Sequence, residues 1–281
     1  MGAFRYTSRS FVRELVMILA AMLFALPFYF LIAISLKSDQ QLTLEPLKPP
    51  LADPNWGNYA DAWSSGGTTG GMGRAFLNTV IITVGSVVCL VLVSSLTAYV
   101  IARRTSKLSN GLYVLFVIGF IMPATLGLVP VYVVMRSAGL LATYHGIIIL
   151  HTAGILPFAV FLYVGFIRAL PAEYEEAAQV DGAGMLRTFF RVVIPLLRPI
   201  TTTVAMLSGL IVWNDFFLAL IFMSGSSIGT LPIALNSFVN ENYTQWNLVF
   251  AGATIAILPV LGVFIVAQRQ FVRGLAGGIR G

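Results

Sequence analysis

The chain has 281 residues, of which 58% are hydrophobic and only 10% are charged, and its mean hydropathy is +0.88. Soluble domains carry about 25% charged residues, and a compact globule of this size could not hide so much apolar surface from water. The composition therefore excludes a water-soluble domain. The net charge of +6 would suit nucleic acid. However, the basic residues stand beside hydrophobic runs, which is typical of membrane orientation, so we expect no nucleic-acid partner.

Six stretches are long enough to cross a membrane, since a helix needs about 20 mainly apolar residues to span the hydrocarbon core. We predict an all-α integral membrane protein with about six transmembrane helices in contact with lipid. The first stretch exceeds the roughly 7–15 apolar residues of a signal peptide, so we expect it to be retained. Prolines inside several stretches predict kinks. The six stretches are Leu15–Leu36, Ala75–Ala102, Leu112–Met135, Gly146–Ala169, Thr201–Met223 and Leu248–Ala267.

The basic residues predict which side of the membrane each loop faces. If the N-terminus is cytoplasmic, 13 of the 17 Lys and Arg residues lie on the inner side. The four on the outer side are Lys37, Lys48, Arg74 and Arg136. The positive-inside rule favours this arrangement, and an even number of spans places both termini in the cytoplasm.

Two larger segments then fall on the outer side. Ser38–Gly73 is rich in Pro, Gly and Ser, and its Asn58-Tyr59 and Trp63 suggest a short amphipathic turn. Ser224–Asn247 is polar. Either segment is a candidate for contact with an extracellular partner, although ordinary solvated loops have the same composition.

The cytoplasmic segment Pro171–Pro199 begins with a predicted helix. Pro171 suits the first helical turn, where its missing N–H would have no partner in any case. Three glutamates follow within two turns, where the helix dipole favours negative charge. Gly182, directly after Asp181, is expected to end this helix in a left-handed conformation.

A second helical stretch is predicted from Met185 toward Val193. Pro195 and Pro199 then mark the return of the chain to the membrane. The segment as a whole therefore predicts a helix–turn–helix on the cytoplasmic face.

The same segment carries a motif with fixed spacing. Glu176-Ala177-Ala178 is followed after three residues by Gly182, and nine further residues lead to Val192-x-Ile194-Pro195. This pattern resembles the EAA loop of ABC importer permeases, Glu-Ala-Ala-x3-Gly-x9-Ile-x-Leu-Pro, with two aliphatic replacements. The resemblance implies that the loop, over residues 170–199, couples the permease to an ATPase. The implied coupling residues are Glu176, Ala177, Ala178, Asp181, Gly182 and Pro195.

Other short motifs narrow the resemblance. Trp213-Asn214-Asp215, Asn78 near the start of the second stretch, and the ending that begins Gln268-Arg269-Gln270-Phe271 are similar to the maltose-type carbohydrate permeases. The likeness is to the smaller permease partner and extends over essentially the whole chain. It implies a single permease domain over 1–281 in a bacterial inner membrane. It also implies a cytoplasmic tail over 268–281, too glycine-rich to fold alone, that reaches the ATPase.

The sequence lacks the elements needed to hydrolyse ATP. That reaction uses a glycine-rich loop ending in Gly-Lys-Ser or Gly-Lys-Thr, and none of the three lysines follows a glycine. We expect no enzyme activity, no metal site and no cofactor in this chain, with ATP and Mg held by partner subunits. The resemblance implies a second permease subunit, two cytoplasmic ATPase subunits and an extracellular or periplasmic solute-binding protein. The helix Glu176–Gly182 would dock in a groove on one ATPase.

Alternative functions stay open at this point. The importer could carry another polar solute, such as a glycerol phosphate ester. An ion-driven transporter would keep ionisable residues within its spans, but only Asp215 lies well inside one. A membrane enzyme would need a catalytic cluster, yet His145 and His151 stand six residues apart and so on different helix faces. We expect both histidines to be polar residues of the membrane interface.

A few polar residues inside the predicted spans are candidates for the solute path: Asn78, Trp213, Asn214 and Asp215. Their side chains could exchange hydrogen bonds with the hydroxyl groups of a sugar. Equally, Asp215 could pair within the helix bundle and fix its packing. The partner permease could also hold most of the sugar.

Overall fold

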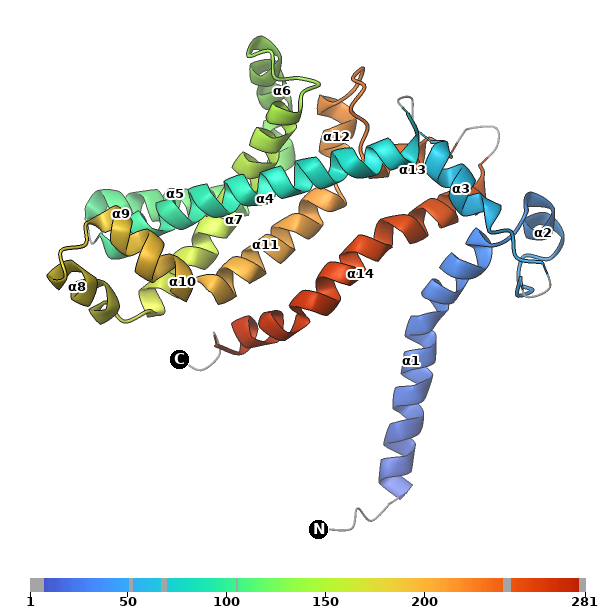
Figure 1. Cartoon of the computed structure of the whole chain (residues 1–281), viewed down its shortest axis with the longest axis horizontal. Coiled ribbons are helices and arrows are strands. Elements are labelled where there is room, and N and C mark those ends of the chain that lie inside the picture. Colours follow the sequence, from blue (N-terminus) through green and yellow to red (C-terminus); the bar gives the residue numbers. More distant parts are fainter. Residues whose placement is uncertain (1–7, 51–52, 67–69, 105, 240–243, 278–281) are drawn as a thin grey trace. The chain divides into compact units, whose positions relative to one another are not determined.

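The computed structural model describes residues 8–50, 53–66, 70–104, 106–239 and 244–277. Over these ranges the chain is helical apart from its turns and loops, with one isolated β-bridge between Val239 and Thr244. The fold is therefore all-α, as predicted (Figure 1). The elements are α1 (Ser8–Ser35), α2 (Asp39–Leu44), α3 (Gly57–Ser64), α4 (Gly71–Arg103), α5 (Lys107–Ile121), η1 (Ala124–Gly127), α6 (Leu128–Ser137), α7 (Tyr144–Ala169), α8 (Glu173–Val180), α9 (Met185–Thr188), η2 (Phe189–Val193), α10 (Ile194–Leu196), α11 (Arg198–Trp213), α12 (Phe217–Phe222), α13 (Leu231–Asn236) and α14 (Trp246–Gly277).

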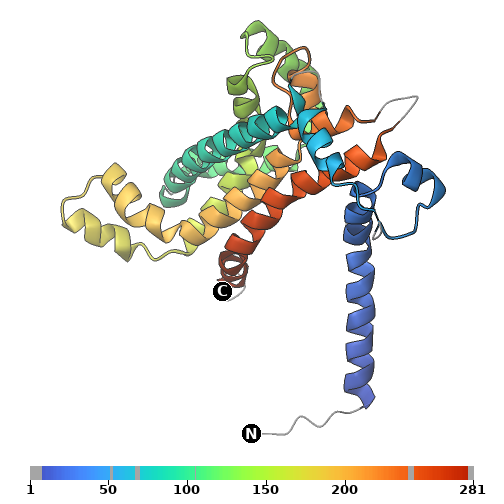
Figure 2. The ribbon, with the colours of Figure 1, turned by 45° about the vertical axis from the view of Figure 1, so that its right-hand side comes forward.

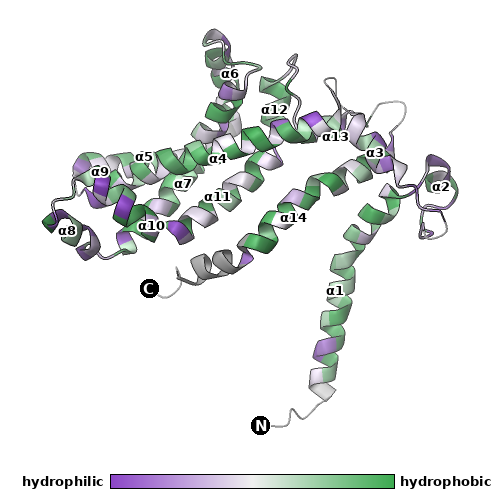
Figure 3. Ribbon diagram, in the orientation of Figure 1, coloured by the Kyte–Doolittle hydropathy of each residue, from purple (hydrophilic) through white to green (hydrophobic). Residues whose placement is uncertain are grey.

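Four helices of the described chain, α1, α4, α7 and α14, are long and apolar enough to cross a membrane. The number rises to six if each of two bent helix pairs counts as one span. Figure 3 shows hydrophobic residues along most of α1 and α4, and hydrophilic residues around α8 to α10. The chain is an integral membrane protein with about six spans.

Two predicted spans are not continuous helices. The stretch Leu112–Met135 breaks between α5 and η1, and the helices on either side are bent by 91°. Pro123 stands at the break, and Met122 before it has the extended backbone that a following proline imposes. The stretch Thr201–Met223 divides into α11 and α12, with Asp215 in the turn between them. In both places a local helix-ending signal overrides a hydrophobic run.

The chain divides into two compact units, Met1–Gly73 with Ala234–Leu258, and Arg74–Ile233 with Pro259–Gly281. The single permease domain stays a prediction.

The first unit contains α1, and a buried polar cluster holds the end of that helix. The Asn58 amide donates to the carbonyl oxygens of Ser35 and Lys37, each at 2.8 Å. The Lys37 ammonium is also buried and donates to two carbonyls of the following loop. Burial lowers the pKa of Lys37, and the Glu45 carboxylate opposes this shift. Asn58 therefore organises this segment from within and presents no surface to a partner, whereas Trp56 and Trp63 are exposed.

The second unit contains two apolar clusters along α4. One gathers around residues 90–101 of α4 and joins α7, η2 and α11, with Tyr163, Phe189 and Leu197 fully buried. The other lies around Ile82 and includes Phe222 of α12. Figure 2 shows α8 and α9 extending beyond these packed helices. The unit thus presents its helix–turn–helix at one end of a packed helical core.

Candidate functional site

The first half of the helix–turn–helix ends as predicted. Helix α8 carries its three glutamates in the first turn, where they face the positive end of the helix dipole. Gly182 has a φ of +77°. Its N–H donates to the Gln179 carbonyl, and the Ala183 N–H donates to the Ala178 carbonyl, each at 2.9 Å. These two bonds form a Schellman motif, which satisfies the last carbonyls of α8.

The second half is helical from Met185 to Leu196, with a π-helical segment η2 in the middle. Pro195 has no N–H to donate to the carbonyl four residues earlier, and the Ile194 N–H donates to Phe189, five residues earlier. The chain then turns by 76° between Leu196 and Arg198. Pro199, in the first turn of α11, follows this bend directly.

Most of the predicted coupling residues lie on the surface. Glu176, Ala177, Asp181, Gly182 and Pro195 are exposed, and Ala178 is half-buried. Large apolar side chains beside them are exposed as well, with Val180 the most open at 88%. An exposed apolar face on a short helix is a feature of surfaces that bind a partner.

One buried residue of this loop was not predicted as part of a site. Glu175, next to Glu176, is buried, and its carboxylate accepts two hydrogen bonds and forms an ion pair. Arg103 of α4 approaches Oε1 with both Nε and Nη2, each at 2.8 Å, and the Tyr99 hydroxyl donates to Oε2 at 3.0 Å. Arg103 Nη2 also donates to the Leu170 carbonyl at 3.1 Å. Adjacent positions on a helix point about 100° apart, so α8 turns one glutamate inward and the next outward.

The four candidate path residues do not form one cluster. Asn78 is buried, donates its amide to the Gly229 carbonyl at 2.8 Å and accepts from the Tyr144 hydroxyl at 2.7 Å. It therefore joins α4 to α7 and to the segment before α13. Asn214 is exposed, and its amide donates to the Leu210 carbonyl.

Asp215 begins α12. Its carboxylate accepts from the N–H groups of Leu218 at 3.2 Å and Ala219 at 2.9 Å, as a helix-capping side chain does. His151 Nε2 lies 3.7 Å from the same carboxylate. His151 is buried, with 4% exposed, so the prediction that it is an interface residue is wrong, whereas His145 is exposed. The pair supports the packing interpretation of Asp215.

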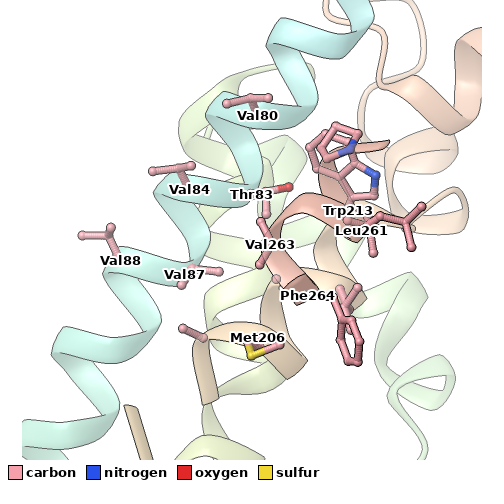
Figure 4. Close-up of a pocket in the computed structure, with 15 residues that line it drawn as sticks. Val80, Thr83, Val84, Val87, Val88, Met206, Trp213, Leu261, Val263 and Phe264 are labelled. Atoms are coloured by element: carbon pink, nitrogen blue, oxygen red, sulfur yellow. The ribbon is translucent and has the colours of Figure 1, made fainter. Parts of the chain in front are cut away.

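Trp213 lines a cavity of about 510 Å³ between α4, α11 and α14 (Figure 4). The walls are mainly aliphatic, and Met206 and Phe264 line the cavity together with Trp213. Thr83 contributes a hydroxyl that has no hydrogen-bond partner among the described residues. A sugar needs several convergent polar groups, so these walls suit an apolar occupant better than a free sugar.

The predicted tail is only partly described. Helix α14 continues to Gly277, so residues 268–277 are helical as an extension of this helix. The last four positions, 278–281, lie outside the described residues.

An all-α membrane unit with an exposed helix–turn–helix joined to its core defines a class, the helical membrane permeases, and comparison with known proteins gives the family. Residues 90–277 match the family "binding-protein-dependent transport system inner membrane component". The chain belongs to this family.

Relatives and a solved structure agree with this assignment. The chain is 38% identical, over 99% of each chain, to the melibiose/raffinose/stachyose import permease protein MelC of Bacillus subtilis. It is 31% identical, over 93% of each, to the probable starch degradation products transport system permease protein AmyC of Thermoanaerobacterium thermosulfurigenes. A chain from the crystal structure of a bacterial ABC transporter involved in alginate import matches with a TM-score of 0.79, at 24% identity, covering 96% of this chain and 100% of that one. That last likeness shows the fold.

Proposed function

We propose that this chain carries an oligosaccharide of the melibiose, raffinose or stachyose kind across the membrane. The chain is a permease of an ATP-driven sugar importer, as its family and its sugar-importing relatives indicate. The observation that carries the choice of solute is the 38% identity to the melibiose/raffinose/stachyose permease over 99% of both chains. An importer of another polar solute, such as a glycerol phosphate ester, is the alternative that the uptake test below separates.

The energy comes from partner subunits in this proposal. Two cytoplasmic ATPase subunits bind ATP and Mg, and this chain binds neither. The exposed positions Glu176, Ala177 and Asp181, with the apolar Val180 between them, form the surface that docks on one ATPase. Gly182 ends the helix that carries that surface. Pro195 lies near the end of the second helical segment, which supports it.

Membership of the family also implies the other subunits of the assembly. A second permease subunit completes the path, and a solute-binding protein delivers the sugar from the outer side. Both termini of this chain are cytoplasmic, as the distribution of basic residues supports. The tail 268–281 contacts the ATPase subunits. Of the four candidate path residues, Asn214 has the exposed side chain best able to meet a solute.

Uptake in cells tests the solute. A host that cannot import raffinose would express this chain with its partner subunits, and radiolabelled raffinose, maltose and glycerol 3-phosphate would be supplied in parallel. We expect uptake of raffinose only, and none when the binding protein is omitted. Uptake of glycerol 3-phosphate but not raffinose would overturn the proposed solute while leaving the transporter class intact.

A further inference from the structure

The end of α4 is tied to the helix–turn–helix by a buried polar network. Glu175 of α8 is 7% exposed and Tyr99 of α4 is 4% exposed. The Glu175 carboxylate accepts one hydrogen bond from Arg103 Nε and one from the Tyr99 hydroxyl, and Arg103 Nη2 forms an ion pair with it. Charge-assisted bonds of this kind are short, directional and strong. The network therefore holds α8 in one position relative to α4.

The same residues of α4 also reach the other parts of the loop. The Tyr99 ring packs on Phe189 of η2, with ring centroids 5.1 Å apart. Arg103 also donates to the Leu170 carbonyl at the end of α7. Two residues one turn apart on α4 thus contact both halves of the helix–turn–helix and the end of the helix that leads into it.

The network borders an open pocket. A cavity of about 570 Å³ lies between the end of α4 and the turn from α8 to α9, with Arg104, Gln179 and Met185 among its lining residues. Because this pocket is open, few packed atoms join α8 directly to α4 here. The network of Glu175, Arg103 and Tyr99 supplies a direct polar link between the two helices at this place.

We infer that Glu175 is a positioning residue that transmits the motion of the docked helix α8 to the transmembrane helix α4 through Arg103 and Tyr99. The inference rests on the proposed function, because it requires an ATPase that moves α8. In this mechanism Glu176, on the outer face of α8, meets the ATPase, while Glu175, on the inner face, moves the span. An ATPase that moves α8 would thereby shift the conformational equilibrium of α4, a span that it does not contact.

The test compares two charge-removing variants with a matched control in the full reconstituted complex. Glu175→Gln and Arg103→Gln each disrupt the network, whereas Glu173→Gln removes the same charge from an exposed position of α8. We expect raffinose uptake per ATP hydrolysed to fall at least fivefold in Glu175→Gln and Arg103→Gln and to be unchanged in Glu173→Gln. The double variant should be no worse than Arg103→Gln, because that variant already removes the pairing with Glu175 together with the bond to the Leu170 carbonyl. Arg103→Lys, which keeps a charge, should retain part of the coupling.

A second readout follows α4 without requiring transport. The only cysteine of the chain, Cys89, is exposed on α4, and a spin label there reports the motion of this helix in a complex whose partner subunits lack cysteine. We expect the spectrum to change between the nucleotide-free and the vanadate-trapped complex, and this change to be lost in Glu175→Gln.

The outcomes separate the two proposals. Unchanged uptake per ATP and an unchanged spin-label response in Glu175→Gln would overturn the inference and leave the proposed function intact. Loss of the ATPase subunits on purification of Glu175→Gln would also overturn it, because the network would then serve assembly. A wild-type complex that does not take up raffinose would contradict the proposed solute, while the spin-label comparison would still decide the role of Glu175.

Discussion

The imidazole of His151 in α7 lies with its Nε2 3.7 Å from Oδ2 of Asp215, in the turn that separates α11 from α12. Both side chains are shielded, at 4% and 14% exposed. Asp215 also holds the first turn of α12 through two backbone N–H groups. This arrangement supports a packing role for the carboxylate within the bundle.

Two substitutions at Asp215 separate packing from solute contact. Asp215→Ala removes the capping acceptor, which typically costs about 0.5–2 kcal/mol, and should lower the melting temperature of the purified complex. Asp215→Asn keeps an acceptor oxygen and should leave the KM for raffinose unchanged. A raised KM in Asp215→Asn, with an unchanged melting temperature, would show that the carboxylate meets the solute. Asn214→Ala changes the exposed neighbour. It is the matched control because Asn214 is the candidate path residue best able to meet the solute.

Asn78 is expected to be a stability residue. In Asn78→Ala, the Gly229 carbonyl and the Tyr144 hydroxyl both lose the partner that they have now. A buried polar group left unpaired typically costs about 1–3 kcal/mol. We expect a lower melting temperature in detergent and less protein in the membrane, with normal uptake per surviving molecule. Normal stability combined with a loss of uptake would instead assign Asn78 to the solute path.

Gly182 provides a test of the turn that ends α8. Its φ of +77° is strained for other residues, and a Cβ placed there would meet no atom within 4 Å. Steric cost should therefore come from the backbone alone, at roughly 1–2 kcal/mol for a β-branched residue. We predict that Gly182→Val inserts normally but loses stimulated ATP hydrolysis and transport together. Gly182→Asn, which tolerates this conformation, should retain both. Normal transport in Gly182→Val would mean that this turn is not needed for coupling.

Thiol labelling tests the predicted orientation. With Cys89 replaced by Ser, single cysteines at Gln179 and Ser65 occupy exposed positions. An impermeant maleimide should label position 65 in intact spheroplasts and position 179 only after permeabilisation. Labelling of position 179 from outside would reverse the orientation.

Local signals were sufficient to predict much of the helix–turn–helix. The end of α8 at Gly182 depends on a glycine and its immediate neighbours, so the sequence could specify it. Pro195 and Pro199 act locally as well. The hydrophobic stretches predicted the membrane class for the same reason, since lipid selects for length and composition alone.

Contacts between distant segments could not be predicted in this way. The EAA-like spacing selects Glu176, but the sequence gives no separate role to Glu175 until the face that α8 turns toward Arg103 is known. The pairing of His151 with Asp215 likewise depends on how α7 meets the turn after α11. The break at Pro123 shows a related limit, because membrane helices tolerate some prolines and break at others. Pro157 lies inside a continuous α7.

Measuring which energy source drives uptake is the most direct test of the proposed function. The complex of this chain with its partner permease, ATPases and solute-binding protein would be reconstituted in proteoliposomes, and raffinose uptake measured with ATP at the ATPase side or with a proton gradient alone. The account predicts uptake that requires both ATP and the binding protein and that stops when the ATPase phosphate-loop lysine is replaced. Uptake driven by the proton gradient without ATP would contradict it.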